Sequence, residues 1–256
     1  MLNIHAVPSF NDNYIWLIQS PDNQQVIIID PGDATPVINE LTDRQLEPVA
    51  ILVTHHCHDH VNGIPALVKR YDIPVYGPAK ESVPLLTHPL MAIKSLHIGK
   101  NIPNIEVLDT PGHTAGHISF VIGDCLFPGD TLFGAGCGRL HNGTAEQLFH
   151  SLQQFSTLPA QTKVYCAHEY TETNLRFAIT VEPDNVAILQ RIKETSRIRQ
   201  QNLPSLPSTL GLELATNPFL RCNQAEVITS AQQFSGKTLH TAVEVFTTLR
   251  LWKDQF

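Results

Sequence analysis

The sequence has no apolar run that approaches the roughly 20 residues needed to span a membrane as a helix. Its N-terminal residues lack the basic region and following apolar segment that mark a secretory signal peptide. It also lacks a run of basic residues, and its net charge is −7, which argues against nucleic acid as the main partner. The sequence therefore predicts a cytoplasmic protein that binds neither a membrane nor nucleic acid.

Paired cysteines are missing as well. The five cysteines form an odd number, and none belongs to a Cys-x-x-Cys motif, which indicates thiols in a reducing compartment rather than a disulfide framework. With 16% charged and 42% hydrophobic residues, the composition is that of a globular protein. A chain of 256 residues is long enough for one large domain, or for a domain with an appendage.

One short segment concentrates side chains that bind metals. Residues 54–60 read Thr-His-His-Cys-His-Asp-His and directly follow the apolar run 51–53. Imidazole and carboxylate groups are ordinary ligands of first-row metals, and so many of them in one loop indicate a metal site. The sequence predicts that this metal loop begins where a buried strand ends.

Three further side chains of the same kind follow apolar runs downstream. His113 lies in a Pro-Gly-His-Thr-Ala-Gly-His segment, Asp130 in Pro-Gly-Asp-Thr and His168 in Cys-Ala-His-Glu-Tyr. Glycine before His113 and Asp130 lets the backbone turn sharply at the end of a strand. These side chains can share a site with the metal loop only if the fold brings the strand ends together.

These motifs together resemble the hydrolases of the metallo-β-lactamase fold, and more closely the glyoxalase II (hydroxyacylglutathione hydrolase) family. The metal loop alone identifies only the superfamily, whereas His168-Glu169-Tyr170 and the C-terminal Lys-Asp-Gln-Phe are narrower signals. The resemblance runs from end to end, through residues 11–16, 30–33, 54–60, 129–133, 136–140, 167–171 and 250–256. It implies an α/β protein, an αββα sandwich with a C-terminal helical domain.

Apolar periodicity alone predicts a mixed α/β region up to about residue 170. Its expected strands are residues 2–7, 14–18, 26–29, 50–54, 75–76, 93–97, 105–109, 118–122, 125–127 and 163–166, and its expected helices are 34–43, 62–71 and 144–155. Helices are expected afterwards at 172–180, 185–201, 224–234 and 241–253. The predicted organisation is a dimetal hydrolase domain, residues 1–170, and a helical substrate-binding domain, residues 171–256.

The resemblance implies a binuclear metal site. The expected ligands are His55, Cys57 and His113 for one divalent ion, Asp59, His60 and His168 for the other, and Asp130 as a bridge between them. Zinc is the first expectation, with iron or manganese as alternatives, because the same ligands serve all three. The expected nucleophile is a metal-bound hydroxide that attacks a thioester carbonyl, and Asp59 and Asp130 are the expected catalytic residues.

Cys57 departs from the family's His-x-His-x-Asp-His pattern. Aligning Asp59 and His60 puts Cys57 where the second histidine should be, and a shift of one residue fails because residues 60 and 61 are His and Val. Two outcomes stay open. A thiolate can bind zinc at about 2.3 Å if the loop or the metal moves, or the position is left to water and metal occupancy falls.

Three histidines near these motifs are not expected to be ligands. Neighbours in an extended loop point to opposite sides, so His56 and His58 are expected beside the ligands or toward solvent. His117 is expected to form a local hydrogen bond.

The expected partner is a small-molecule glutathione thioester, whose carboxylates require a basic pocket on a negatively charged protein. The resemblance implies that this pocket contains Arg139, His141, Tyr170, Arg250 and Lys253. Arg139 replaces a family lysine and can bind a carboxylate with two hydrogen bonds. Arg250 and Lys253 are expected to bind the glycine carboxylate, and the alternative for both is a solvated helix end.

The leading interpretation is a monomeric thioesterase that hydrolyses S-D-lactoylglutathione to D-lactate and glutathione, which completes methylglyoxal detoxification. One alternative is a related metallohydrolase that acts on another ester or a lactam, but such an enzyme has no need of the C-terminal cations. Another is a non-catalytic binding protein whose metal site is impaired by Cys57, but a decayed site would be expected to have lost more than one ligand.

Overall fold

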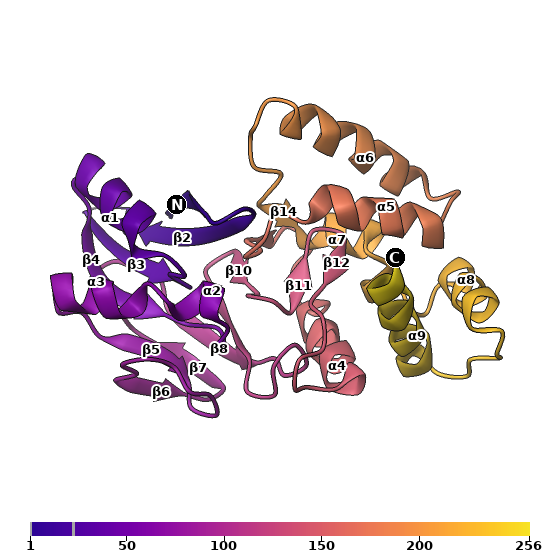
Figure 1. Ribbon diagram of the computed structural model, residues 1–256, viewed down its shortest axis with the longest axis horizontal. Helices are drawn as coiled ribbons and strands as arrows, with labels where there is room; N and C mark the ends of the chain where they lie inside the picture. The colour runs from indigo at the N-terminus through magenta and orange to yellow at the C-terminus, as the bar shows by residue number, and fades with distance from the viewer. Residues whose placement is uncertain (1, 22–23) are drawn as a thin grey trace. The chain divides into compact units, whose positions relative to one another are not determined.

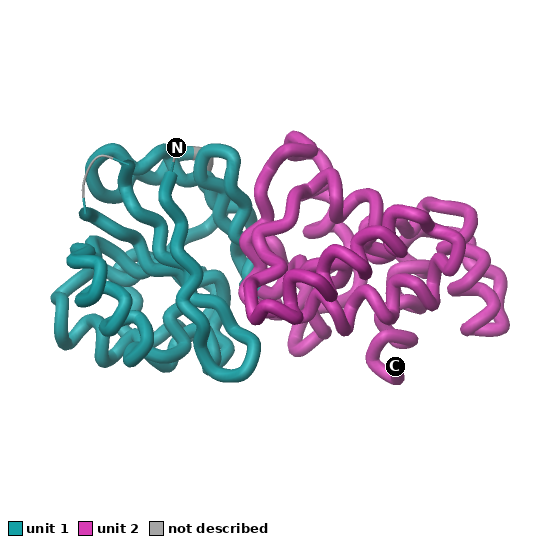
Figure 2. The backbone as a smooth tube through the Cα atoms, turned by 90° about the horizontal axis from the view of Figure 1, so that it is seen from above, with its two compact units in different colours: residues 1–109, 116–129 teal, residues 110–115, 130–256 magenta. Residues whose placement is uncertain are grey.

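The computed structural model describes residues 2–21 and 24–256. The chain forms two compact units, which we call unit 1 and unit 2 (Figure 2). Unit 1 contains Met1–Asp109 and Gly116–Gly129, and unit 2 contains Thr110–Ala115 and Asp130–Phe256. Among the described residues, the helices are all too short or too polar to cross a bilayer.

Unit 1 contains a six-stranded mixed sheet with the order β1-β2-β3-β4-β5-β6 (Figure 1). These strands are β1 (Asn3–Ser9), β2 (Asn13–Gln19), β3 (Gln25–Ile29), β4 (Glu47–Leu52), β5 (Val75–Pro78) and β6 (His88–Leu90). Strand β2 is antiparallel to its neighbours β1 and β3, whereas β3 to β6 run parallel. Parallel neighbours require a crossover, and helices α1 (Ala34–Asp43) and α3 (Ile64–Tyr71) supply two of these.

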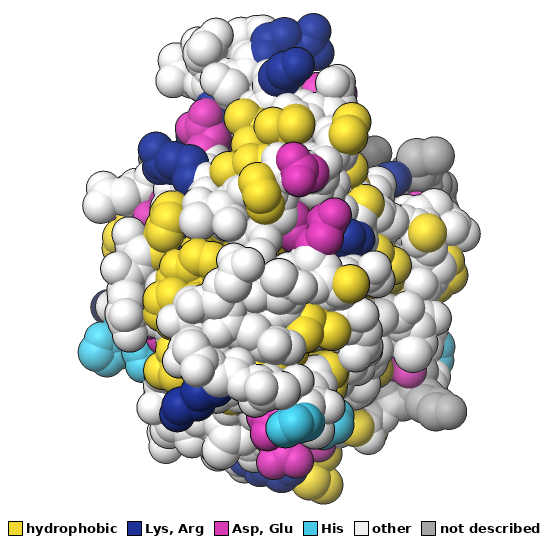
Figure 3. All heavy atoms as spheres, turned by 90° about the vertical axis from the view of Figure 1, so that its right-hand side faces the viewer, with side chains coloured by type: hydrophobic (Ala, Val, Ile, Leu, Met, Phe, Trp, Pro, Cys, Tyr) yellow, Lys and Arg dark blue, Asp and Glu magenta, His cyan; other side chains and the backbone are white. Residues whose placement is uncertain are grey.

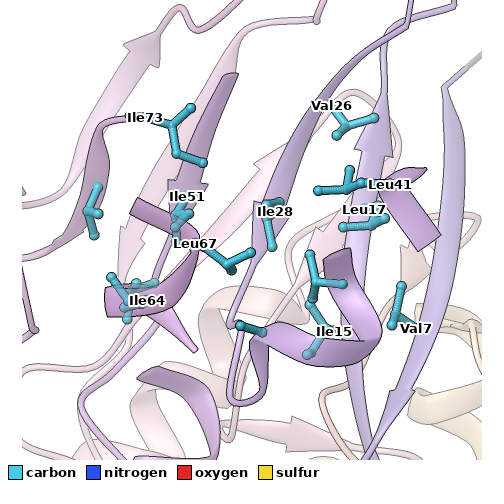
Figure 4. Close-up of a cluster of buried hydrophobic side chains, with 14 of the residues drawn as sticks. Val7, Ile15, Leu17, Val26, Ile28, Leu41, Ile51, Ile64, Leu67 and Ile73 are labelled. Atoms are coloured by element: carbon cyan, nitrogen blue, oxygen red, sulfur yellow. The ribbon is translucent and has the colours of Figure 1, made fainter. Parts of the chain in front are cut away.

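A buried apolar core lies between this sheet and the helices α1 and α3 (Figure 4). Ile15 and Leu17 of β2 belong to it, together with Leu67 of α3, and all three are fully buried. The alternate β2 residues Trp16 and Ile18 are 3% and 0% exposed, so the opposite face of the strand is covered too. Strands buried on both faces read as continuous apolar runs, which is why the sequence pattern found them.

The other strands of unit 1 form an antiparallel series, β7 (Ile93–Leu96), β8 (Ile105–Asp109), β9 (Ile118–Ile122) and β10 (Cys125–Phe127). The predictions for β8, β9 and β10 are confirmed with the expected bounds. The amide of Ile118, at the start of β9, donates to the carbonyl of Thr54 at 2.9 Å. This bond ties the start of β9 to the metal loop.

Unit 2 combines short strand pairs with most of the helices. The pairs are β11 (Leu132–Phe133) with β12 (Gly136–Cys137), and β13 (Lys163–Val164) with β14 (Ser208–Thr209). The helices are α4 (Ala145–Phe155), α5 (Thr171–Val181), α6 (Val186–Arg199), α7 (Leu210–Thr216), the 3₁₀ turn η1 (Pro218–Leu220), α8 (Ala225–Ser235) and α9 (Ala242–Gln255). Capping boxes at Thr144 and Thr241 start α4 and α9. Figure 3 shows hydrophobic side chains reaching the surface among charged ones in several places.

The predicted helical C-terminal region is confirmed, and the differences lie in short elements. The expected helix at 62–71 begins at Ile64, and a separate turn, α2 (His58–Val61), precedes it. The metal loop is therefore only partly extended. The strands β6, β11, β12 and β14 were not predicted, because two or three residues are too few to show a periodic pattern. The seven-residue helix α7 was not predicted either.

Candidate metal centre

The metal loop begins where the buried strand β4 ends. Cys57 is the N-cap residue of α2 and is half-buried, so Asp59 and His60 lie on the first turn of this short helix. The preceding Asp30-Pro31-Gly32 turn packs directly on it, since a Cβ atom on Gly32 would lie 1.9 Å from the carbonyl oxygen of Asp59. Gly32 is required here by the close approach of two backbones.

Asp30 determines the tautomer of both buried histidines in this loop. Its Oδ2 lies 3.0 Å from Nδ1 of His60 and accepts the Thr54 hydroxyl proton at 2.7 Å. Because the Thr54 hydroxyl donates its hydrogen bond to Asp30, its oxygen accepts a hydrogen bond from Nδ1 of His55 at 3.0 Å. Because Nδ1 carries the proton in both rings, each Nε2 presents a lone pair, which is the tautomer that binds a metal. The ligand atoms of Asp30, His55 and His60 all lie within 4.8 Å of one another.

Asp59 is oriented by a residue from another strand. Nδ2 of Asn13, at the start of β2, donates to Oδ2 of Asp59 at 2.9 Å. That oxygen also lies 3.4 Å from Nε2 of His60. Two ligands that each bind a tetrahedral cation at 2.0–2.1 Å are about 3.3 Å apart. The spacing of Asp59 and His60 therefore fits two ligands of one cation better than it fits a hydrogen bond.

In unit 2, the Asp130 carboxylate faces two imidazoles with different oxygens. Nε2 of His113 is 3.5 Å from Oδ2, and Nε2 of His168 is 3.4 Å from Oδ1. All three side chains are almost buried. Both distances again match the separation of ligands around a shared cation. A carboxylate with one oxygen toward each histidine has the arrangement of a bridge between two ions.

His113 is fixed by a backbone carbonyl. Its Nδ1 lies 2.8 Å from the carbonyl oxygen of Arg139, which can only accept, so Nδ1 carries the proton and Nε2 presents its lone pair. Gly138 packs closely here, since a Cβ atom there would be 2.0 Å from the carbonyl oxygen of Asp130 and 3.2 Å from Nδ1 of His113. The position of the segment 138–139 therefore decides how His113 is aimed.

The helical part of unit 2 holds the β11–β12 hairpin that leads into this segment. Asn174 of α5 donates to the carbonyl of Gly134 at 3.0 Å, and Asn217 donates to that of Gly136 at 2.9 Å. Glu213 of α7 accepts from the amide of Ala135 at 2.8 Å. These side chains come from 40 to 81 residues downstream, and they link the helices to the segment that orients His113.

His168 is positioned by aromatic packing. The Tyr170 ring stacks on it with centroids 4.8 Å apart and planes at 8°, and the Phe133 ring meets it edge-on at 5.5 Å. Phe133 also meets the Tyr170 ring edge-on, at 5.2 Å. Tyr170, expected at the substrate, therefore lies against an expected metal ligand.

The neighbouring histidines have roles of their own. His56 is tied to Glu81, whose Oε2 lies 2.7 Å from its Nδ1, and His58 is exposed at the start of α2. His117 is 1% exposed, and its ring stacks on that of His55 with centroids 4.8 Å apart. Asp30, Asn13 and Glu81 contact the metal loop, and Thr54 is its first residue. None of the four was singled out from the sequence as a site residue.

The residues expected at the substrate have different environments. The Arg139 side chain is 76% exposed, and His141 contacts the His113 ring edge-on at 4.7 Å. Arg250 is 4% exposed and donates from Nη1 to the carbonyl of Cys137 at 3.0 Å and from Nη2 to Asp254 at 2.9 Å.

Lys253 is half-buried, with Nζ over the rings of Phe177 and Phe256 at 5.5 Å and 5.3 Å. Burial, followed by the positive charges of Arg250, Arg139 and Arg176, lowers the pKa of Lys253 to about 8. An anion bound near this group of cations would be favoured by their charge.

The donor set fits divalent cations, since imidazole and carboxylate suit zinc, iron and manganese. The lone-pair tautomers, the burial and the 3.4–3.5 Å spacings agree with that chemistry. Together, the fold and these His and Asp clusters suggest a binuclear metal site.

The chain is similar to known proteins over its whole length. Residues 9–168 match the metallo-beta-lactamase superfamily, and residues 169–256 match the hydroxyacylglutathione hydrolase C-terminus. The hydroxyacylglutathione hydrolase of Nitrosomonas europaea is 50% identical, with 100% of this chain and 97% of the relative covered. That of Alkalilimnicola ehrlichii is 49% identical, with both chains fully covered.

Solved structures agree on the fold. The BLEG-1 B3 metallo-beta-lactamase has a TM-score of 0.64 and 26% identity, over 86% of this chain and 99% of that one. TTHA1623 in a di-iron-bound form has a TM-score of 0.59 and 25% identity, over 85% of this chain and 100% of that one. The expected metallo-β-lactamase fold with a C-terminal helical region is confirmed, and the chain belongs to the hydroxyacylglutathione hydrolase family.

Proposed function

We propose that this protein is a thioesterase that hydrolyses S-D-lactoylglutathione to D-lactate and glutathione. The observation that carries the proposal is the Asp130 carboxylate, which faces His113 and His168 at 3.5 Å and 3.4 Å with different oxygens. The choice of substrate is supported by the full-length similarity to relatives named hydroxyacylglutathione hydrolase. Residues 1–170 are the proposed hydrolase domain, and residues 171–256 are the proposed substrate-binding domain.

The proposed cofactors are two divalent cations, with zinc as the first expectation and iron or manganese as alternatives. The proposed ligands are His55, Cys57, Asp59 and His60 from unit 1 and His113, Asp130 and His168 from unit 2. When bound, such ions lower the pKa of a water molecule to about 7 and polarise a carbonyl group. Iron stays among the alternatives because the similar protein TTHA1623 is described in a di-iron-bound form.

Side chains of the protein orient the proposed metal ligands. Asn13 keeps one oxygen of Asp59 in a fixed direction, so this carboxylate can accept a proton from the attacking water while it faces the cation site. Asp30 keeps His60 in the tautomer that leaves its Nε2 lone pair available. The leaving group is a thiol with a pKa of about 8.5, so it departs as thiolate without a dedicated general acid.

The proposed glutathione pocket uses the cations and rings of unit 2. The exposed Arg139 guanidinium can bind a carboxylate with two hydrogen bonds, and Lys253 can bind another. Tyr170 and His141 are proposed to contact the peptide. Arg250 is also proposed to favour the glycine carboxylate through its charge, and its bond to the Cys137 carbonyl supports a second role, in holding the chain just before Arg139.

The deciding experiment combines metal analysis with a thioester assay. We expect about two divalent ions per chain and release of thiol from S-D-lactoylglutathione, lost on chelation and restored by metal. A lactoyl thioester of a small thiol without carboxylates is the control, and it should react far more slowly at equal concentration. Metal without turnover would instead indicate a binding protein, and equal rates on both substrates would indicate another thioesterase or esterase.

We also propose that the protein acts in the cytoplasm as a monomer. The five cysteines, which are all thiols, support a reducing compartment. Size-exclusion chromatography with light scattering tests the oligomeric state, for which we expect the mass of one 28.4 kDa chain.

A further inference from the structure

A buried carboxylate outside the expected ligand set is bonded to the metal loop. Glu81 follows strand β5, and its side chain is 3% exposed. Its Oε2 accepts from the backbone amide of His56 at 2.7 Å and lies 2.7 Å from Nδ1 of the same residue. Its Oε1 accepts from the backbone amide of Gly116 at 3.1 Å. One carboxylate therefore receives three N–H donors from two separate segments.

One of the two segments that Glu81 joins borders an expected metal ligand, and the other borders a histidine that packs on that ligand. His56 lies between His55 and Cys57, so fixing its amide fixes the peptide that leaves His55. Gly116 directly precedes His117, whose ring stacks on His55 with centroids 4.8 Å apart. Gly116 also packs tightly on the carboxylate arm, because a Cβ atom there would lie 2.6 Å from Cγ of Glu81.

We propose that Glu81 is a positioning residue of the metal centre, which fixes the direction of the His55 ring from both sides. On one side it holds the backbone next to His55, and on the other it holds the backbone next to the ring that stacks on His55. This inference rests on the proposed function, because it assumes that His55 binds a metal. Substitution of a residue that orients a metal ligand without binding the metal itself typically changes metal affinity 10- to 100-fold.

The chemistry of the three donors explains why a carboxylate stands at this position. A carboxylate only accepts hydrogen bonds and has room for all three N–H groups. A glutamine of the same size would turn an NH₂ group toward at least one of these donors. The Glu81→Gln substitution therefore keeps the volume of the buried side chain and loosens at least one of the two segments.

The test compares Glu81→Gln with Glu47→Gln in the full chain loaded with metal. Glu47 is an exposed residue at the other end of β4, the strand that leads to the metal loop, and its substitution removes the same charge. Zinc affinity is measured by competition with a chromophoric chelator, and ligand geometry by the absorption spectrum of the cobalt-substituted protein. We expect Glu81→Gln to weaken binding of zinc by about 10- to 100-fold and to change the cobalt spectrum. Glu47→Gln should match the wild type in both.

A role in stability alone predicts a different result. In that case Glu81→Gln lowers the melting temperature of the metal-free protein but leaves zinc affinity and the cobalt spectrum unchanged, and the inference is overturned. Glu81→Asp keeps the charge on a shorter side chain and should show a smaller loss of zinc affinity. This variant replaces Glu81→Gln in the test if the glutamine variant does not fold. A wild-type protein that binds no metal would refute the proposed function itself, whereas normal wild-type binding with an unaffected Glu81→Gln variant refutes only the positioning role.

Discussion

The expected metal ligands of the two units are held in different ways. In unit 1 they come from one continuous loop, and side chains orient them: Asp30 and Thr54 fix the two histidine tautomers, and Asn13 fixes Asp59. In unit 2 they come from three separate turns. There His113 is aimed by the carbonyl of Arg139, and His168 is packed between aromatic rings.

This difference suggests how each half responds to change. A loop with side-chain partners can change one residue at a time, and Cys57, which departs from the family's pattern of metal ligands, lies in this half. The turns of unit 2 depend on backbone positions that the helices hold through Asn174, Glu213 and Asn217. A substitution there shifts a segment rather than a single ligand. The variants below test this contrast, beginning with the largest expected effect.

The Asp130→Asn substitution should have the largest effect, because it removes the charged group that faces both unit 2 histidines. An amide keeps the shape but presents one NH₂ to an imidazole nitrogen and neutralises the expected bridge between two cations. If that costs about 3–4 kcal/mol of transition-state stabilisation, kcat falls by roughly 100- to 1,000-fold. Turnover of S-D-lactoylglutathione and metal content check this. A kcat within tenfold of the wild type, at full metal loading, would argue against the bridging role.

The Asp30→Asn substitution tests the side-chain control of unit 1. Oδ2 of Asp30 accepts from the Thr54 hydroxyl and from His60, and Oδ1 accepts from the Thr54 backbone amide at 2.8 Å, so an asparagine must turn its NH₂ group toward some of these donors. The metal loop or its histidine tautomers are then no longer fixed, and metal affinity should fall about 10- to 100-fold. The matched change in unit 2 is Asn217→Ala, which removes a buried bond to the hairpin. It should cost about 1–3 kcal/mol of folding stability before it changes the affinity of any single ion. Chelator competition and urea unfolding measure the two effects. If both variants lose affinity and stability in the same proportion, the two halves are not held differently.

The Cys57→His substitution should sharpen the contrast by restoring the family pattern in unit 1. An imidazole reaches farther from its backbone than a thiolate does, so it can meet a cation without movement of the loop. We expect higher metal content or up to about tenfold higher turnover, since a neutral ligand also leaves the cation a stronger Lewis acid. Identical stoichiometry and rate in both forms would show that position 57 does not limit the centre.

The sequence predicted the metal ligands but not the residues that orient them. The metal loop stands out because its donors are consecutive, and His113, Asp130 and His168 stand out because each follows an apolar run. Asp30 follows the apolar run 26–29 in the same way and lies within a recognised motif, so a search for carboxylates at strand ends would have found it. Asn13 lies 46 residues from its partner Asp59. Only the folded chain joins them, because hydrogen-bonding partners at such separations leave no local pattern.

The sequence also did not predict the shortest helices and strands or the burial of one charged side chain. The expected extended loop contains the helical turn α2, because a single turn of four residues has no periodicity to detect. The sequence predicts Arg250 in the substrate pocket, with a solvated helix end as the alternative, but its side chain is buried against the Phe219 ring, with its Cζ 5.1 Å from the centroid. A charged residue gives no sequence signal for burial when its partners are backbone carbonyls from 113 residues away.

The smallest expected effect concerns the pH dependence of substrate binding in unit 2. Burial and nearby cations lower the pKa of Lys253 to about 8, so its ammonium loses charge as pH rises through 8. A substrate carboxylate binds the charged form, and KM should therefore be lowest below pH 8 and rise several-fold between pH 8 and 9.5. The Lys253→Met variant should have a higher KM at pH 7 and lack this rise.

Deprotonation of Lys253 should increase folding stability as pH rises, whereas it weakens substrate binding. Because the pKa is lower in the folded protein than the usual 10.5, the unfolded chain binds more protons between pH 8 and 10.5, and the wild type gains stability over that range relative to Lys253→Met. Measuring KM and urea midpoints for both proteins across this range separates the two effects. Parallel KM profiles would exclude Lys253 from the pocket even if the stability curves diverge, since desolvation alone produces the divergence, whereas a bound carboxylate is needed for the change in KM.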